Sequence, residues 1–340
     1  MRSAAGRGYT GAKAARRSDH LDLSLGRSAR VAVPGQTVRL IADDLTGALD
    51  TAAEFVGLAG PVPVFWGVPA ADALPPSAAL DTGTREASAV SGAVAAVEAL
   101  APALREAGIG YKKLDSLLRG HALAELASCF RAGGWTHGIL APAFPSQGRV
   151  TRGGLQFARV GTGAWEPVRG DLVATLLGAG MPARLGRLDE PLRPGIAVFD
   201  AETDADLARV AALGRAAAGP VLWCGSGGLA RALAAAAGAP VRPAADLRRP
   251  VLGLFGSDQA ATARQLAACG GAWVELPDGG PAGVALLRAR MAAEGVALAS
   301  LDLPTGLDRA AAARRTAPGF GALARAAPGR APSSPPEGKR

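Results

Sequence analysis

Residues 39–55, RLIADDLTGALDTAAEF, constrain the fold of this chain more than any other segment. A short apolar strand, Val38–Ala42, is followed by two adjacent acids, Asp43 and Asp44, and then by a helix. The strand is too apolar for an exposed edge, so both carboxylates should emerge at its carboxyl end, where open α/β sheets bind ligands. Paired carboxylates there can bind a cation, orient hydroxyls or accept a proton. The alternative is that Asp44 or Thr46 only caps the helix.

Short apolar strands continue to alternate with amphipathic helices along residues 38–236. The expected strands lie in VRLIA, PVPVFWG, GYKKLD, HGILAP, GIAVFDA and VLWCG, and the expected helices include 88–107, 122–131, 204–217 and 228–236. Residues between Thr151 and GIAVFDA form a Gly-rich stretch to which no element is assigned. Because strands alternate with helices, the sequence predicts an α/β fold with mostly parallel sheets covered by helices.

The 340 residues are enough for two domains. Residues 1–37 lack apolar periodicity and predict a disordered leader. The first α/β domain is expected over 38–240, and the stretch 238–250, with three prolines, is expected to be a linker. The segment VLGLFGS then opens a second α/β domain over 250–325. Residues 326–340 are rich in Pro and Ser and predict a disordered tail.

The positive net charge of the chain does not indicate nucleic-acid binding. The formal charge is +8, but residues 1–37 carry +5 and residues 325–340 carry +3, which leaves no excess for the body of the protein. Aromatic residues make up only 4% of the chain, so stacking platforms for single strands are not expected either.

Cysteine and apolar content limit the class of protein further. Cys129, Cys224 and Cys269 are odd in number and far apart, which disfavours a disulfide framework and a zinc site and fits a reducing cytoplasm. We therefore expect no protein metal site. The sequence contains no run of eighteen apolar residues and no apolar signal core near its start, so no membrane partner is expected.

Four more polar clusters follow predicted strands. They contain Asp81, Thr82, Thr84 and Arg85; Lys113, Asp115, Ser116 and Arg119; the Pro-Gly loop 141–151 with Arg149; and the turn 223–233 with Ser226. Taken singly, the first could be a turn and a helix cap, although an Arg there could instead fork onto a carboxylate. The third could be only a loop, or a rigid frame that directs amides and a guanidinium toward an anion. Gly256 and Ser257 repeat the strand-to-helix turn in the second domain and could hold a nucleotide phosphate.

Neither a Rossmann fingerprint nor a P-loop motif is present. Instead the motifs ADDLTGALD, DTGTR, KKLDSLLRG, PAFPSQGRVT, FDAETDADL, CGSGGLA and LFGSDQAATARQ, in this order, resemble the four-carbon acid sugar kinase family over residues 38–325. Members of that family phosphorylate threonate, erythronate or 3-oxo-tetronates with ATP. The resemblance implies an acid-sugar-binding first domain, a nucleotide-binding second domain and a reaction in the cleft between them.

The resemblance also implies roles for individual residues. Substrate-binding residues would be Arg85, Lys113, Ser116, Arg119 and Arg149, and cofactor-binding residues would be Ser226, Gly256 and Ser257. Phosphoryl transfer needs a base and Mg²⁺ beside ATP, and the base would be Asp43 or Asp44, with Asp115 in reserve. The substrate's carboxylate needs a cation, for which the candidates are Arg85, Lys113 and Arg119.

The chain departs from the family pattern in three respects, one of which is a shorter stretch after Thr151. Leu117 occupies a position where threonine is usual, and the motifs G-G-[ED]-T and S-G-x-F-G are not found before the sequence changes to RAPSSPPEGKR. We therefore expect a C-terminally truncated chain whose second domain is incomplete. Two alternatives stay open, a kinase and a non-catalytic acid-sugar-binding remnant of one. The substrate among the acid sugars and the oligomeric state, a homodimer included, are also open.

Overall fold

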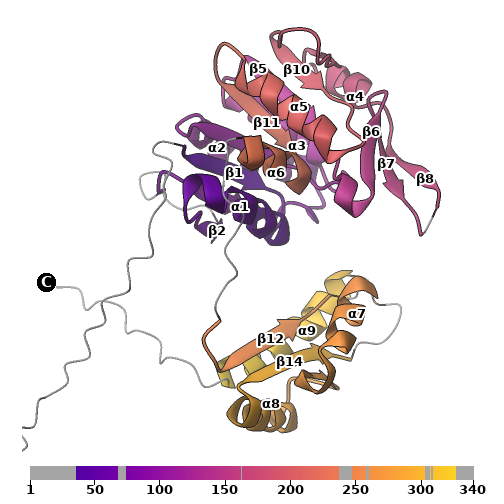
Figure 1. The fold of residues 1–340 in the computed structure, drawn as a ribbon. Helices are drawn as coiled ribbons and strands as arrows, with labels where there is room; N and C mark the ends of the chain where they lie inside the picture. The colour runs from indigo at the N-terminus through magenta and orange to yellow at the C-terminus, as the bar shows by residue number, and fades with distance from the viewer. Residues whose placement is uncertain are drawn as a thin grey trace, which may run out of the picture. The chain divides into compact units, whose positions relative to one another are not determined.

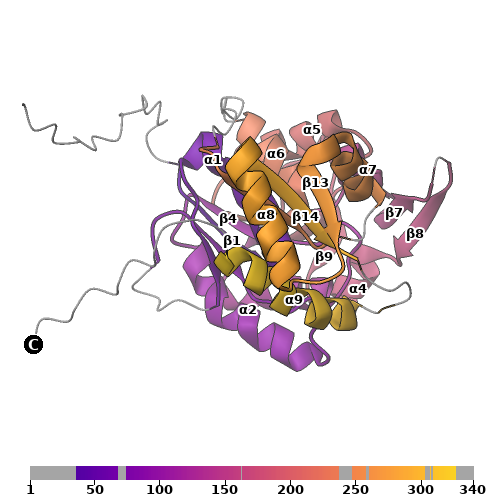
Figure 2. The same ribbon diagram turned by 90° about the horizontal axis from the view of Figure 1, so that it is seen from below.

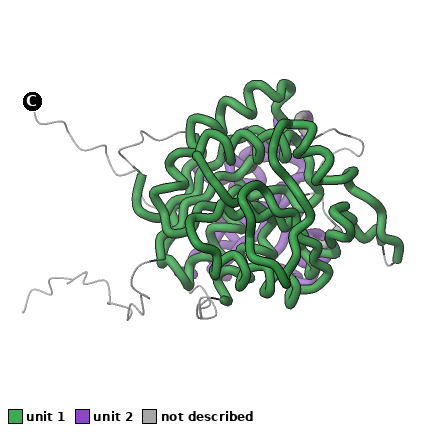
Figure 3. The backbone as a smooth tube through the Cα atoms, turned by 90° about the horizontal axis from the view of Figure 1, so that it is seen from above, with its two compact units in different colours: residues 1–242 green, residues 243–340 purple. Residues whose placement is uncertain are grey.

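The computed structural model describes residues 36–67, 74–161, 163–236, 247–257, 260–302, 307 and 309–326. The chain divides into two units, residues 1–242 and residues 243–340, which Figure 3 colours separately. Most of the predicted leader, linker and tail, namely residues 1–35, 237–246 and 327–340, lie outside the described residues. No helix in the described part of the chain is both long enough and apolar enough to cross a membrane.

Unit 1 is built on an eight-stranded sheet in which all neighbouring strands are parallel. The strands, in spatial order, are β2 (Val64–Trp66), β3 (Ala78–Asp81), β1 (Val38–Ala42), β4 (Ile109–Lys113), β11 (Val221–Gly225), β5 (His137–Ala141), β10 (Gly195–Val198) and β9 (Ala183–Leu185). This arrangement confirms the predicted α/β class with mostly parallel strands. The strands of a parallel sheet are buried on both faces, so helices must cover each face. The strands of this sequence are apolar on both faces, as this arrangement requires.

Six helices cover the described sheet of unit 1. They are α1 (Leu45–Ala59), α2 (Val90–Leu104), α3 (Ala122–Ala132), α4 (Leu172–Gly178), α5 (Asp204–Arg215) and α6 (Gly227–Ala236). Side chains alternate along β1, so Leu40 packs with residues of α1, α5 and α6, whereas Ile41 packs on the other face with residues of α2, α3 and α4. Figure 1 shows the two helical layers.

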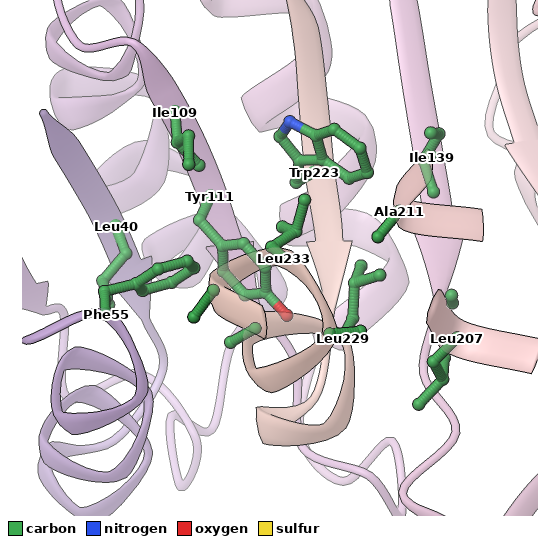
Figure 4. Close-up of a cluster of buried hydrophobic side chains, with 14 of the residues drawn as sticks. Leu40, Phe55, Ile109, Tyr111, Ile139, Leu207, Ala211, Trp223, Leu229 and Leu233 are labelled. Atoms are coloured by element: carbon green, nitrogen blue, oxygen red, sulfur yellow. The ribbon is translucent and has the colours of Figure 1, made fainter. Parts of the chain in front are cut away.

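The core on the α1 face is centred on β4 and β11. The Phe55 and Tyr111 rings meet edge to face, with their centroids 5.6 Å apart, and leucines of α6 complete the cluster (Figure 4). Tyr111 is fully buried, and its hydroxyl donates a hydrogen bond to the Ser226 carbonyl oxygen at 2.6 Å. This bond satisfies a polar group that would otherwise be costly to bury, and it joins β4 to the start of α6.

The sheet topology determines where a ligand site can form. From β1 the chain passes to β2 and β3 on one side, and then returns to β4 on the other side of β1. The carboxyl ends of β1 and β4 therefore flank a topological switch point, where open α/β sheets bind ligands. Asp43 directly follows β1, and Lys113 is the last residue of β4.

Residues 149–169 form a three-stranded antiparallel sheet, which the sequence analysis did not predict. Its strands are β6 (Arg149–Arg152), β7 (Leu155–Arg159) and β8 (Trp165–Arg169), and it extends from one side of unit 1 (Figure 1). Gly153 and Gly154 form the two-residue turn between β6 and β7, with φ values of 57° and 74°. Such turns need positive φ at both positions, so the glycines that suggested a loop are the signature of a hairpin.

Unit 2 contains a second parallel sheet, with the strand order β12 (Val251–Phe255), β14 (Val296–Leu301) and β13 (Trp273–Leu276). Its helices are α7 (Ala260–Ala268), α8 (Pro281–Glu294) and α9 (Arg309–Ala326). Helix α8 packs along β14 (Figure 2), and the small core gathers Leu276, Leu287 and Met291 with alanines of β14. Two 3₁₀ turns complete the described elements, η2 (Pro145–Gln147) in unit 1 and η3 (Gly270–Ala272) in unit 2.

Candidate functional site

An arginine from the loop after β3 binds both acids that follow β1. The Arg85 guanidinium forks onto Asp43, with Nε 2.7 Å from Oδ2 and Nη2 2.6 Å from Oδ1, and its Nη1 and Nη2 lie 2.8 Å from the Asp44 oxygens. The backbone N–H of Arg85 also donates to the Asp43 carbonyl oxygen at 3.0 Å, which extends the pairing of β1 and β3 beyond the strands. Planar two-point pairing of this kind is among the strongest contacts available to a carboxylate.

Asp43 is almost completely buried, with 3% of its side chain exposed. Burial acts to raise its pKa, but the hydrogen bonds from Arg85 and the charges of Lys112, Arg85 and Lys113 outweigh burial, so the pKa of Asp43 lies below its usual range. Asp43 is therefore a charged anchor of the cluster. Arg85 is correspondingly occupied by protein carboxylates, so its predicted contact with a substrate carboxylate would require a guanidinium that already has four hydrogen bonds.

Asp44 has the two functions that the sequence analysis treated as alternatives. Its Oδ1 accepts the Gly47 N–H at 2.9 Å and caps α1, and the same carboxylate binds Arg85. With 28% of its side chain exposed, it is the most accessible of the three carboxylates proposed as bases. Helix capping and membership of the polar cluster are compatible because one carboxylate has enough lone pairs for both.

Asp115 begins a tight loop that holds Arg119. Its two oxygens accept Nε at 2.6 Å and Nη2 at 2.9 Å from the Arg119 side chain, and Oδ2 also accepts the Arg119 N–H at 3.1 Å. Burial acts to raise the pKa of Asp115, but the Arg119 hydrogen bonds and the Arg85 charge bring it to about 2. The Asp115 Oδ1 lies 3.9 Å from Arg85 Nη1, so this loop joins the cluster formed by Asp43, Asp44 and Arg85.

The backbone of this loop is strained where it meets Arg85. Leu118 is fully buried and has a φ of 53°, in the left-handed region that a leucine rarely adopts. Gly120 has a φ of 67°, and a Cβ there would lie 2.8 Å from the Arg85 carbonyl oxygen. Only glycine fits this close approach. Strained residues concentrate at functional sites, and these two hold Arg119 and Arg85 together.

Lys113 differs from its neighbours because its ammonium has no hydrogen-bond acceptor among the residues that the structure describes. Lys113 is 8% exposed. Burial lowers its pKa and Arg85 adds to this effect, while Asp43, Asp44 and Asp115 oppose it, with the net result that the pKa lies below its usual range. A Cβ at Gly47 would lie 2.8 Å from Lys113 Nζ, so the glycine leaves room for the ammonium at the start of α1. An ammonium at the end of a largely buried side chain, with donors that no described residue uses, is a binding group for an anionic or hydroxylated ligand.

A second ion pair, which is fully buried, supports the loop that carries Arg85. Lys112 Nζ lies 2.8 Å from Glu125 Oε2, both side chains are 0% exposed, and the Thr84 hydroxyl donates to Glu125 Oε1 at 2.7 Å. Burial acts to lower the pKa of Lys112, but Glu125 outweighs it. The pair ties β4 and α3 to the loop that carries Arg85. Glu125 could not be identified from the sequence, because a single acid in an amphipathic helix resembles a solvent-exposed residue.

Asp81, at the end of β3, was noted in the sequence but not selected as a catalytic residue. Its Oδ1 accepts the Gly83 N–H at 2.8 Å. Burial raises its pKa, and the charges of Asp44 and Asp43 add to this effect. In contrast to Asp43 and Asp115, Asp81 has no arginine bound to it within the described part of the chain. It is therefore an additional candidate for accepting a proton.

The remaining predicted substrate residues lie beside this cluster. The Ser116 carbonyl oxygen accepts a hydrogen bond from Gln156 at 2.8 Å. Arg149, at the start of β6, binds the backbone and side chain of Gln147. Burial lowers the pKa of Arg149, while Asp115 raises it and Arg119 lowers it, which places these three charges within electrostatic range.

The predicted cofactor residues are divided between the units, with Ser226 after β11 in unit 1 and Gly256 and Ser257 after β12 in unit 2. Ser226 is 1% exposed, its hydroxyl donates to the Ala143 carbonyl oxygen at 2.6 Å and accepts the Gly228 N–H at 3.1 Å, and it thereby shapes the start of α6. In unit 2, Ser257 follows β12, and its hydroxyl accepts a hydrogen bond from Thr262 at 3.0 Å. Gly256 lies next to Phe320. Nucleotide binding by these three residues stays a prediction.

Across the described ranges, no group of three or more His, Cys, Asp or Glu side chains is arranged to hold a metal ion. The carboxylates nearest the switch point are instead neutralised by Arg85 and Arg119. We therefore assign no protein ligand to Mg²⁺.

Comparison with known proteins connects this site to a family. The model of the sugar-binding N-terminal domain matches residues 38–175 and 168–233. The chain is 37% identical to the D-threonate kinase of Cupriavidus necator over 261 residues and 33% identical to that of Bordetella bronchiseptica over 268 residues. These matches cover 68% and 69% of this chain and 62% of each relative, so the chain spans less than two thirds of the curated relatives. A solved structure from Salmonella typhimurium LT2 shares the fold, with a TM-score of 0.60 and 19% identity over 85% of this chain and 80% of that one.

Proposed function

Because the chain belongs to the four-carbon acid sugar kinase family, we propose that unit 1 binds a four-carbon acid sugar such as D-threonate at the carboxyl ends of β1, β3 and β4. We further propose that the whole protein transfers a phosphoryl group from ATP to a hydroxyl of that sugar. D-Threonate is the first substrate to test because both curated relatives are D-threonate kinases.

The observation that carries this proposal is the ammonium of Lys113, a residue that is only 8% exposed. It lies beside three carboxylates yet has no hydrogen-bond acceptor among the described residues, whereas Arg85 and Arg119 are each bound to a carboxylate in a two-point contact. An acid sugar offers a carboxylate for such an ammonium and hydroxyls for the carboxylates around it. Binding would complete a set of contacts that the protein alone leaves incomplete.

The same geometry narrows the set of carboxylates that could accept the proton of the attacking hydroxyl. Asp43 and Asp115 are more deeply buried, with 3% and 9% of their side chains exposed, and have lowered pKa values, so they are weak bases and serve to hold Arg85 and Arg119. Asp44 and Asp81 are more accessible, and Asp81 has a raised pKa. A carboxylate near the attacking hydroxyl orients it and takes its proton as the bond to phosphorus forms. We propose Asp44 or Asp81 for this role.

ATP would supply the phosphoryl group, and Mg²⁺ would offset the charge on its phosphates. Unit 2 offers the turn after β12, with Gly256 and Ser257, as a candidate phosphate contact. The proposed binding of the sugar by unit 1 does not depend on this proposed contact with ATP.

Release of ADP from ATP in the presence and absence of D-threonate or D-erythronate tests the proposal, with thermal stabilisation by each sugar measured in parallel. Turnover that depends on the sugar supports the kinase. Stabilisation by the sugar without turnover would support the non-catalytic binder, which is the second alternative for a chain that spans 62% of its relatives. If neither sugar produces turnover or thermal stabilisation, both the kinase and the non-catalytic binder are contradicted.

A further inference from the structure

One buried amide connects the antiparallel sheet to the acid-sugar cluster. Gln156 in β7 is 0% exposed. Its Nε2 donates to the Ser116 carbonyl oxygen at 2.8 Å and to the Pro142 carbonyl oxygen at 3.4 Å, and its Oε1 accepts the Thr151 hydroxyl at 2.7 Å. Both N–H groups of the amide therefore face carbonyl oxygens of two different loops.

The orientation of this amide is determined by its partners. Carbonyl oxygens only accept hydrogen bonds, so Ser116 and Pro142 require the NH₂ end of Gln156 on their side. Thr151 lies directly opposite Gln156 in the β6–β7 pairing, and its hydroxyl reaches the remaining oxygen. The Thr151 bond satisfies the amide oxygen but is not needed to orient the NH₂ group.

The two elements that Gln156 connects, the loop of Ser116 and strand β6, each carry an arginine. Ser116 lies in the loop that begins at Asp115 and ends with Arg119. A hydrogen bond to its carbonyl oxygen therefore holds that loop in position. Arg149 lies two residues before Thr151 on β6, and residues two apart in a strand lie on the same face of the sheet. The charges of Asp115 and Arg119 both act on Arg149. The two arginines thus come from elements that Gln156 joins.

We propose that Gln156 is a positioning residue, which fixes the loop of Arg119 against β6 so that Arg149 and the Nη1 group of Arg119, which Asp115 does not bind, together bind one oxyanion group of the ligand. This inference depends on the proposed function, because it assumes an acid-sugar ligand at the cluster. Gln156 itself touches no substrate in this proposal. It acts through the Ser116 carbonyl oxygen, and its sequence neighbourhood gave no signal for it because a glutamine in a strand resembles an exposed polar residue.

The oxyanion has two possible sources with the same chemistry. It could be the carboxylate of the acid sugar or the phosphoryl group of the phosphorylated product. Titration calorimetry of the whole chain with D-threonate and with phosphorylated threonate distinguishes them, because only the second probe carries a phosphoryl group.

The test uses Gln156→Met, which keeps the length of the side chain and removes both donors. Thr151→Val is the matched control, because it removes the third hydrogen bond of the same amide and leaves the Ser116 contact intact. Gln156→Leu, which also removes both donors and buries no charge, is the second variant if Gln156→Met does not fold. Melting temperatures of all variants measure the structural loss separately from affinity.

We expect Gln156→Met to weaken binding by about ten-fold or more, since small misplacements of binding groups are costly. The control should lose melting temperature but keep the parent's affinity. Weakening of both probes identifies the carboxylate, and weakening of phosphorylated threonate alone identifies the phosphoryl group. Parent-like affinity of Gln156→Met, or equal weakening in Thr151→Val, would overturn the positioning role. A parent that binds neither probe would instead contradict the proposed function, and this inference with it.

Discussion

Arg85 binds Asp43 through two parallel hydrogen bonds of 2.7 and 2.6 Å, and this pair is the centre of the cluster at the end of the sheet. Both side chains are nearly inaccessible, with 9% and 3% exposed. The same guanidinium binds Asp44 and approaches Asp115, so one arginine collects acids from β1 and from the loop after β4. The structure therefore brings these four side chains together at one edge of the sheet.

Replacement of Arg85 by Met should destabilise the protein strongly. The Asp43 carboxylate would stay buried without its bidentate partner, a loss that costs about 3–5 kcal/mol in comparable buried pairs. Urea unfolding of the variant and its parent measures this difference. Arg187→Met is the matched control because its ion pair with Asp189 is exposed, and it should leave the free energy of unfolding unchanged. Equal effects of the two substitutions would contradict the structural role of Arg85.

Asp115 should make stability depend on pH in the acid range. Its pKa in the folded protein is about 2, below the ordinary value of 3.8, so its contribution is complete above that ordinary value and is lost as pH falls toward 2. The shift corresponds to roughly 2 kcal/mol, of which about half is lost by pH 3. The difference in unfolding free energy between the parent and Asp115→Asn should be constant above about pH 5 and shrink below it. A difference that stays constant down to pH 3 would contradict this assignment.

The two functions of Asp44 can be separated by substitution. Asn caps helices about as well as Asp, so Asp44→Asn should keep the α1 cap and lose only the charge toward Arg85. Asp44→Ala should lose both and cost about 1 kcal/mol more. We expect Asp44→Asn to lower acid-sugar-dependent turnover or sugar affinity although the fold stays stable. Full activity in a stable Asp44→Asn protein would show that the carboxylate only caps α1.

Removing one partner of the buried ion pair between Lys112 and Glu125 should lower the free energy of unfolding strongly, whereas replacing both partners should lower it much less. Glu125→Gln leaves the Lys112 ammonium without a charged partner and should cost about 3–5 kcal/mol. The double variant Lys112→Met with Glu125→Leu should recover much of that loss because neither charge stays buried. Glu98→Gln on α2, whose carboxylate is exposed and binds Ser128, is the control and should change stability little. Thermal and urea unfolding of the four proteins tests this expectation.

The fold class could be predicted because local patterns determined it. Strand Val38–Ala42 was predicted with the boundaries that the structure has, since a continuous apolar run followed by two acids and a helix start has few other solutions. The antiparallel strands β6 to β8 were not predicted. Their hairpin turn consists of two glycines held by the Asp200 carboxylate from a distant strand end, at 2.7 and 2.9 Å, and no local pattern shows that contact.

The site was predictable to the extent that parallel strands end at one edge of the sheet. Asp43, Arg85, Lys113 and Asp115 follow three such strands, and the structure brings them together. The sequence did not show which charges neutralise one another. Only the geometry shows that Arg85 is bound to acids whereas Lys113 has no acceptor in the described part of the chain, and only tertiary contacts identify Glu125 and Gln156 as supports.

The most direct measurement is a calorimetric titration of the whole chain with D-threonate, carried out for the parent and for Lys113→Met. The substitution removes an ammonium that has no hydrogen-bond acceptor among the described residues and whose pKa burial lowers, so the melting temperature should not fall, while affinity should fall by about ten-fold or more because a charged contact is lost. Arg131→Met, which removes an exposed positive charge at the end of α3, is the matched control and should bind like the parent. Saturable binding that Lys113→Met alone weakens is the predicted result. No binding by the parent, or equal affinity of Lys113→Met and its parent, would contradict an acid-sugar site at Lys113.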